Sequence, residues 1–169
     1  YLHRRQRQMC IRDRAEADHS FRQWLRDRAH GRPIVATLGR HVQIKGLDLV
    51  FDALKDQKDL IWVAAGDGPY RNALEEQIKH HSLDVCLPGM ITPAQREALF
   101  LEATVFVQSS RQIGTRSEGH PVALIEALAA GVPSIVSRSG GMSEIAAKAG
   151  CIQIDVGKRE TLKQAILDL

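Results

Sequence analysis

The stretch PVALIEALAAGVPSIVS, residues 121–137, decides the fold of this chain. Residues 121–130 predict a helix, and Pro121 stands where such a helix would begin. Gly131 and Pro133 are expected to end it, because glycine favours the turn after a helix and proline cannot continue one. Residues 134–137 predict a strand. A helix followed so closely by a strand is typical of an α/β protein.

The same alternation extends in both directions along the chain. Five other short apolar runs predict strands, at residues 34–38, 60–65, 85–87, 104–108 and 151–154. Helices are predicted near residues 21–25, at 47–54, after Pro69, after an N-cap at Thr92, at 143–149 and from 161 onward. We expect a single Rossmann-like α/β domain of about six mostly parallel strands, with helices on both faces. Ligands should then bind at the carboxyl ends of the strands.

The formal charge of +3 has a local origin. Residues 1–14 carry five arginines and one aspartate, so the remaining 155 residues are close to neutral. Residues 9–14 read MCIRDR, which resembles the translation of a transposon end used in sequencing-library adapters. We interpret residues 1–14 as a non-native or disordered segment, 15–32 as a linker or helix, and 33–169 as the Rossmann-like domain. The charge therefore predicts no nucleic-acid partner.

The sequence lacks the patterns that mark several classes of protein. No apolar run approaches the roughly 20 residues of a membrane span. Cys86 and Cys151 are isolated, which favours reduced thiols and a cytoplasmic protein. The chain has no P-loop, no GxGxxG, no GxSxG, and no HExxH or DxD spacing, so we expect no metal and no bound cofactor.

Two cations bracket the loop after the first predicted strand. This loop reads GRHVQIKG, residues 39–46, and Arg40 and Lys45 flank its turn. The helix that follows adds the positive end of its dipole. Together these groups suit a diphosphate. The alternative is that both are solvated surface cations.

Two carboxylates are expected at the same edge of the sheet. Glu118 precedes the predicted helix and Glu126 lies one to two turns inside it. Carboxylates accept hydrogen bonds from hydroxyls, so a spaced pair suits a sugar or a ribose. The alternatives are a helix-dipole partner with a solvated glutamate, or a glycosidase acid/base pair.

In combination, these pieces resemble the C-terminal, donor-binding domain of the retaining family-4 glycosyltransferases (glycosyl transferases group 1). Members of that family have the GT-B fold of two facing Rossmann-like domains. The resemblance runs from about Pro33 to the chain end. It rests on GRHVQIKG at 39–46, AAGDGP at 64–69, LPGMI at 87–91, EGHPVALIEALAAGVPSIVS at 118–137 and GGMSEI at 140–145.

The resemblance implies roles for single residues. Arg40 and Lys45 would bind the nucleotide diphosphate and neutralise it as it leaves, and Glu118 would contact the donor sugar; these three are the implied catalytic residues. Glu126 would contact the ribose hydroxyls. The implied mechanism is metal-independent. The other implied donor-binding residues are Gly39, Met90, Ile91, Gly119, His120, Pro121 and Val122, with the base held by backbone near Met90 and Ile91.

Two features depart from the family pattern. His120 stands where an aromatic or aliphatic residue is more usual, and residues 109–117 form a long lead-in without an assigned role. We also expect an N-terminal acceptor-binding domain to be missing and the last helix to be cut short at Leu169. The chain alone should therefore not transfer sugar. The full-length enzyme is expected in the cytoplasm or peripherally on the cytoplasmic face of a membrane.

Other readings stay open at this point. A nucleotide-sugar epimerase or a glycan phosphorylase would share the double-Rossmann plan. A non-catalytic binding module is the third alternative. The sequence specifies neither the sugar and nucleotide of the donor, which we expect to be UDP- or GDP-linked, nor the acceptor.

Overall fold

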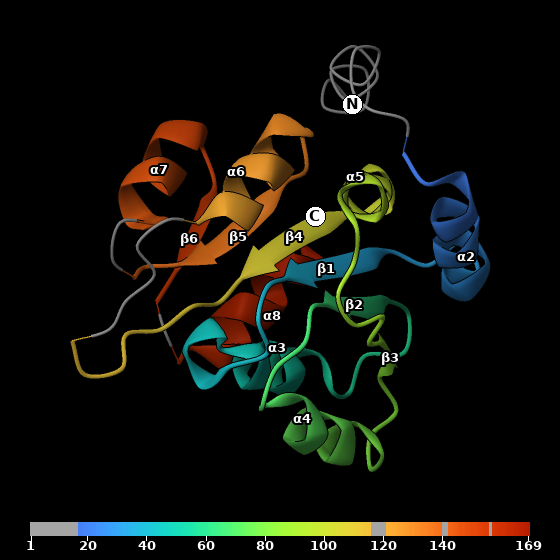
Figure 1. The fold of residues 1–169 in the computed structure, drawn as a ribbon. Coiled ribbons are helices and arrows are strands. Elements are labelled where there is room, and N and C mark those ends of the chain that lie inside the picture. Colours follow the sequence, from blue (N-terminus) through green and yellow to red (C-terminus); the bar gives the residue numbers. More distant parts are fainter. Residues whose placement is uncertain (1–16, 116–120, 140–141, 156) are drawn as a thin grey trace.

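The computed structural model describes residues 17–115, 121–139, 142–155 and 157–169. Its centre is a six-stranded sheet in the order β3-β2-β1-β4-β5-β6 (Figure 1). The strands are β1 (Ile34–Leu38), β2 (Ile61–Ala65), β3 (Asp84–Cys86), β4 (Val105–Gln108), β5 (Ser134–Ser137) and β6 (Ile152–Ile154). All neighbouring strands are parallel. The predicted α/β class and the six strands are confirmed, and the sheet is wholly rather than mostly parallel.

Helices cover both faces of the sheet, as predicted. Figure 1 shows α2, α5, α6 and α7 on one face and α3, α4 and α8 on the other. The helices are α2 (His19–Ala29), α3 (Leu47–Leu54), α4 (Arg71–Ile78), α5 (Pro93–Glu102), α6 (Val122–Ala129), α7 (Met142–Ala149) and α8 (Arg159–Leu167), with a short 3-10 turn, η1 (Gln43–Lys45). This layering explains why the strands are nearly continuous apolar runs.

Successive strand residues enter two separate cores, because side chains of a strand alternate between its faces. In β1, Ala36 packs under α2, α5, α6 and α7, whereas Val35 packs under α3, α4 and α8. Trp62 of β2 is fully buried in the second core. Its indole N–H donates to the hydroxyl of Thr37 at 3.1 Å, so the one polar group of this ring is satisfied.

Helix α2 is longer than the predicted helix near residues 21–25. It begins earlier because the side chain of Asp18 caps it, accepting from the backbone N–H of Phe21 at 2.9 Å. It ends at His30, which adopts the left-handed conformation with φ of 49°. Apolar spacing alone did not reveal either end.

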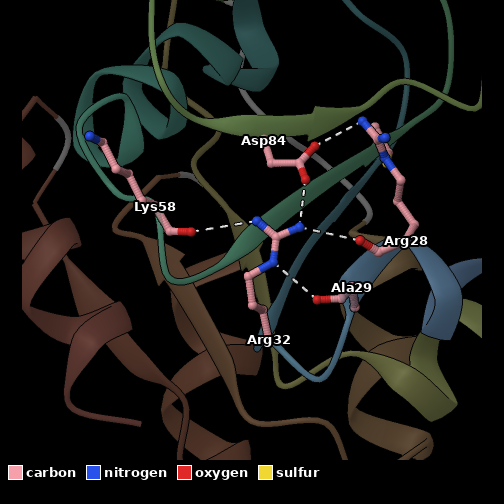
Figure 2. A network of polar contacts seen from close by, with 6 residues as sticks. Arg28, Ala29, Arg32, Lys58 and Asp84 are labelled. Atoms are coloured by element: carbon pink, nitrogen blue, oxygen red, sulfur yellow. Dashed lines mark hydrogen bonds and ion pairs between the residues drawn. The ribbon is translucent and has the colours of Figure 1, made fainter.

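A polar network fixes the end of α2 against the edge strand β3 (Figure 2). The carboxylate of Asp84 accepts from Arg28 at 2.9 Å and from Arg32 at 2.5 Å. Arg32 also donates to the backbone carbonyls of Ala29 and Lys58. One carboxylate therefore links α2, the loop after α3 and the outermost strand of the sheet.

A second ion-pair cluster joins α2 to α5 and makes the stability of the chain dependent on pH. Glu102 pairs with Arg22 and, at 2.9 Å, with Arg26. Burial raises the pKa of the Glu102 carboxyl, but the hydrogen bonds from Arg26 and Arg22 outweigh this effect and hold the pKa below its usual value. A depressed carboxyl pKa stabilises the folded state above the unfolded pKa of roughly 4.3, and this contribution is lost as the pH falls through the folded pKa.

We expect Glu102→Gln to lower the free energy of unfolding by about 1–2 kcal/mol near neutral pH, because a charge-assisted pair is replaced by a neutral amide. The difference from the parent chain should shrink between neutral pH and an acidic pH below the depressed folded pKa of Glu102, where the parent carboxyl itself takes up a proton. Urea unfolding at both pH values measures this. An equal difference at the two pH values would show that the charge of Glu102 is irrelevant.

Candidate functional site

The carboxyl ends of the central strands open into one pocket of about 260 Å³. It lies where β1 and β4 are neighbours, although the chain runs from β1 to β2 before it reaches β4. In open α/β sheets such a change in strand order is where ligands bind. The lining residues are Leu38, Gly39, Arg40, Lys45, Gly66, Met90, Ile91, Arg96, Gln108, Pro121, Val122, Ala123 and Glu126.

The pocket gathers every predicted site residue that the structure describes. Eight such residues come from three separate segments of the chain: Gly39, Arg40, Lys45, Met90, Ile91, Pro121, Val122 and Glu126. The other three, Glu118, Gly119 and His120, lie outside the described residues. The structure thus shows that these residues share one location, and the role of each residue stays a prediction.

The cation-bearing loop is held close to the sheet. The backbone N–H of Gly39 donates to the carbonyl of Ala65 at 3.1 Å. A Cβ on Gly39 would stand 3.5 Å from Cε of Lys45, so the lysine stem crosses this glycine. Gly46 has φ of 64° and precedes α3 directly. Arg40 and Lys45 therefore sit on one wall of the pocket beside the start of a helix.

The loops after β1, β2 and β3 lock together through backbone groups. Gly66 follows β2, and its N–H donates to the carbonyl of Gly89 at 2.8 Å. A Cβ on Gly66 would lie 1.9 Å from the carbonyl oxygen of Gly39. The stretch around Gly66 does not match the dinucleotide pattern GxGxxG, and Gly66 had no predicted role of its own. Its role is to let three loops approach each other at the pocket floor.

A buried histidine lies beneath the same loops. The imidazole of His41 is only 1% exposed. Burial lowers the pKa of His41, and the nearby charge of Arg71 lowers it further, while Asp67, the backbone of Ala64 and Glu75 act in the opposite direction. The ring is therefore neutral at neutral pH, and the charge of this loop comes from its arginine and lysine.

The start of the long segment after β4 buttresses the cation loop. The hydroxyl of Ser109 donates to the carbonyl of Gly46 at 2.7 Å. Arg111 donates from its backbone to Ile44 at 2.8 Å and pairs through its guanidinium with Asp48 of α3. No role was assigned to residues 109–117 from the sequence. Within the described part, 109–115, two residues anchor the wall that carries Lys45.

An ion pair between two helices forms another part of the pocket lining. Arg96 of α5 donates to Oε1 of Glu126 in α6 at 2.6 Å. The same two side chains line a second, larger hollow of about 400 Å³ between α5 and α6. The sequence analysis did not identify Arg96 as a site residue. Its helix was predicted, but the partner across the two helices is a tertiary contact without a local signature.

One side of the pocket is open. Met90 is 76% exposed and Val122 is 57% exposed, so a ligand longer than the pocket can extend past them.

None of the helices in the described residues combines the length and the apolar character that a membrane crossing requires. Those same ranges contain no cluster of three or more His, Cys, Asp or Glu side chains arranged to hold a metal ion.

Comparison with known families identifies the chain. The family model of glycosyl transferases group 1 matches residues 21–169. The chain belongs to this family. The match covers the whole sheet and every pocket-lining segment, so the predicted resemblance is confirmed at the level of glycosyl transferases group 1.

Two curated relatives illustrate the similarity. The chain is 31% identical over 146 residues to the GDP-mannose-dependent alpha-(1-6)-phosphatidylinositol monomannoside mannosyltransferase of Mycolicibacterium smegmatis, covering 78% of this chain and 37% of that protein. It is 33% identical over 121 residues to the 2-deoxystreptamine N-acetyl-D-glucosaminyltransferase of Niallia circulans, covering 68% and 30%. The chain thus spans about a third of the length of these relatives.

The fold also matches a solved structure. Anabaena Alr3699/HepE in complex with UDP-glucose superposes with a TM-score of 0.77 at 20% identity, covering 90% of this chain and 43% of that one. At this identity the likeness establishes the fold alone. The chain has the architecture of one Rossmann-like half of the GT-B fold, as predicted.

Proposed function

We propose that this chain is the donor-binding half of a retaining, metal-independent glycosyltransferase that transfers a hexose from a UDP- or GDP-sugar. The observation that carries the proposal is the pocket itself. Arg40, Lys45 and Glu126 all line it, at the carboxyl edge of a parallel sheet. Cations for a diphosphate and a carboxylate for a diol therefore share one cavity of ligand size.

The chemistry follows from these charges. When the bond between sugar and diphosphate breaks, negative charge grows on the leaving oxygen. Arg40 and Lys45 stabilise that charge because they are held in place before the reaction begins. Glu126 accepts hydrogen bonds from the ribose hydroxyls, and Glu118 from the sugar hydroxyls. With attack from the face that the leaving group occupies, neither glutamate needs to act as a nucleophile.

The remaining parts of the reaction belong to the whole enzyme. An N-terminal domain facing this pocket would bind the acceptor, which is a glycan, a lipid or a small molecule. The pocket supports this arrangement because its open side, around Met90 and Val122, leaves room for a second wall. We place the full enzyme in the cytoplasm or peripherally at the cytoplasmic membrane face, and we propose that the present chain binds donor without transferring sugar.

Calorimetric titration of the chain tests this function directly. We expect saturable binding of at least one of UDP, GDP and ADP, with affinity in the micromolar to low millimolar range, roughly 4–8 kcal/mol. The matching nucleotide sugar should compete for the same site, whereas inorganic phosphate should displace neither ligand. If none of the three diphosphates bound, or if phosphate competed as well as they did, the chain would not be a donor-binding domain.

A further inference from the structure

Arg96 and Glu126 form an ion pair at the wall between two cavities. Arg96 lies in the first turn of α5, and Glu126 lies in α6, thirty residues later in the chain. The guanidinium Nη1 and the carboxylate Oε1 are 2.6 Å apart. About a third of each side chain is exposed, so the pair is neither deeply buried nor free on the surface.

The two oxygens of Glu126 are in different states. Oε1 is held by Arg96, whereas Oε2 is buried and has no hydrogen-bond partner among the described residues. A buried carboxylate oxygen without a donor is unfavourable, and any hydroxyl that reached it would relieve this cost. Arg96 holds only one oxygen, so Oε2 stays available to a ligand hydroxyl once a small rotation about the Arg96 contact uncovers it at the pocket wall.

The helix that carries Arg96 is fixed independently of this pair. Thr92 caps α5 as predicted, because its hydroxyl accepts from the backbone N–H of Gln95 at 3.2 Å. In return, the side-chain Oε1 of Gln95 accepts from the backbone N–H of Thr92 at 3.0 Å. Leu99 and Phe100, one turn further on, are buried in the core. Arg96 is therefore attached to a rigid base and can orient a side chain on the neighbouring helix.

We infer that Arg96 is a positioning residue for nucleotide binding, which holds Glu126 so that its second oxygen accepts the ribose hydroxyls of the donor. This inference rests on the proposed function. Without the arginine, the Glu126 side chain would sample several rotamers, and fixing it again on binding would cost free energy. The arginine also offsets the negative charge of Glu126 in a pocket that must receive a diphosphate.

Positioning and charge compensation predict different results with modified ligands. Unopposed charge on Glu126 repels every nucleoside diphosphate equally, whether or not its ribose carries hydroxyls. Loss of positioning instead weakens only those ligands that have hydroxyls to offer. The informative quantity is therefore the ratio of affinities for a nucleoside diphosphate and for its 2′,3′-dideoxy counterpart.

The experiment is a set of calorimetric titrations of the full chain with UDP and GDP, each beside its 2′,3′-dideoxy form. We expect the parent chain to prefer the hydroxylated ligand by roughly tenfold or more. Arg96→Leu should bring this preference to within about threefold, close to the value for Glu126→Gln. Arg96→Lys, which keeps one donor, should retain an intermediate preference. Combining Arg96→Leu with Glu126→Gln should add little further loss.

The matched control removes a comparable ion pair elsewhere. Arg22 also pairs with a glutamate across two helices, and its side chain is 31% exposed against 30% for Arg96. Arg22→Leu should lower stability and leave the hydroxyl preference unchanged. Melting curves confirm that each variant is folded, and Arg96→Lys carries the test if Arg96→Leu does not fold.

The outcomes separate the inference from the function on which it rests. If the parent chain bound no nucleoside diphosphate, the proposed function would be wrong. If the parent chain and Glu126→Gln behaved as expected but Arg96→Leu kept the full hydroxyl preference, only the role of Arg96 would be wrong. Equal weakening of hydroxylated and dideoxy ligands in Arg96→Leu would assign the arginine to charge compensation and overturn positioning.

Discussion

Gly66→Ala should destabilise this chain more than any other single methyl addition near the pocket. The new Cβ would stand 1.9 Å from the carbonyl oxygen of Gly39, and Gly66 has φ of 125°, which alanine rarely adopts. Neither backbone segment can shift easily, because the N–H of Gly39 is hydrogen-bonded to the carbonyl of Ala65 and the N–H of Gly66 to the carbonyl of Gly89. We expect a loss of at least about 3 kcal/mol in the free energy of unfolding, or no folded protein.

Gly31→Ala is the matched control for this prediction. Gly31 also has a positive φ, 80°, but a Cβ there would meet nothing within 4 Å. It should therefore report the backbone cost alone, about 1–2 kcal/mol. Urea unfolding of the two variants beside the parent chain measures the difference. Equal losses in both would mean that the loops at the pocket floor separate freely, contrary to their hydrogen bonding.

Removing both cations of the first loop should nearly abolish nucleotide binding. We expect Arg40→Ala combined with Lys45→Met to weaken the binding of UDP or GDP by about 100-fold, and each single change by roughly tenfold, because a charge-assisted hydrogen bond contributes about 1.5–3 kcal/mol. Methionine retains the aliphatic stem that crosses Gly39. The loss at position 45 therefore reports charge rather than packing.

A distant lysine provides the control for charge removal. Lys148 lies on α7, is 77% exposed and pairs only with Glu144 among the contacts described for it. Lys148→Ala changes the net charge by the same amount as either single pocket variant and should leave affinity within about twofold, since exposed charges beyond a Debye length are screened. Calorimetry at fixed salt compares all four variants with the parent chain. Unchanged affinity in the double variant would show that the diphosphate does not bind at Arg40 and Lys45.

The sequence was sufficient for the order of elements but not for their spatial arrangement. Apolar runs such as residues 61–65 are buried on both faces, so the strands were visible without any tertiary information. The order in which the strands pair was not visible in the sequence, because β1 lies between β2 and β4 through contacts that are distant in the chain. Helix ends set by single polar groups, such as the Asp18 cap of α2, were also missed.

The site followed the same division. Arg40, Lys45 and Glu126 could be proposed as site residues because they stand in stretches that resemble the family, and the pocket brings them together. Arg96 could not, because its importance comes from a neighbour thirty residues away. Gln108 was missed for a related reason. It ends a strand whose carboxyl end was expected at the binding edge, but only the folded sheet shows that its side chain lines the pocket.

The interlocked loops have a consequence for how this protein would respond to its solution conditions. The amide groups of Gly39 and Gly66 are already engaged with neighbouring carbonyls, so these two glycines do not offer their N–H groups to a phosphate. Of the groups of this loop that line the pocket, the charged side chains of Arg40 and Lys45 are then left to meet the diphosphate. Their attraction is weakened by dissolved ions. Nucleotide affinity should therefore decline steadily with ionic strength, more steeply than at a site built from backbone amides.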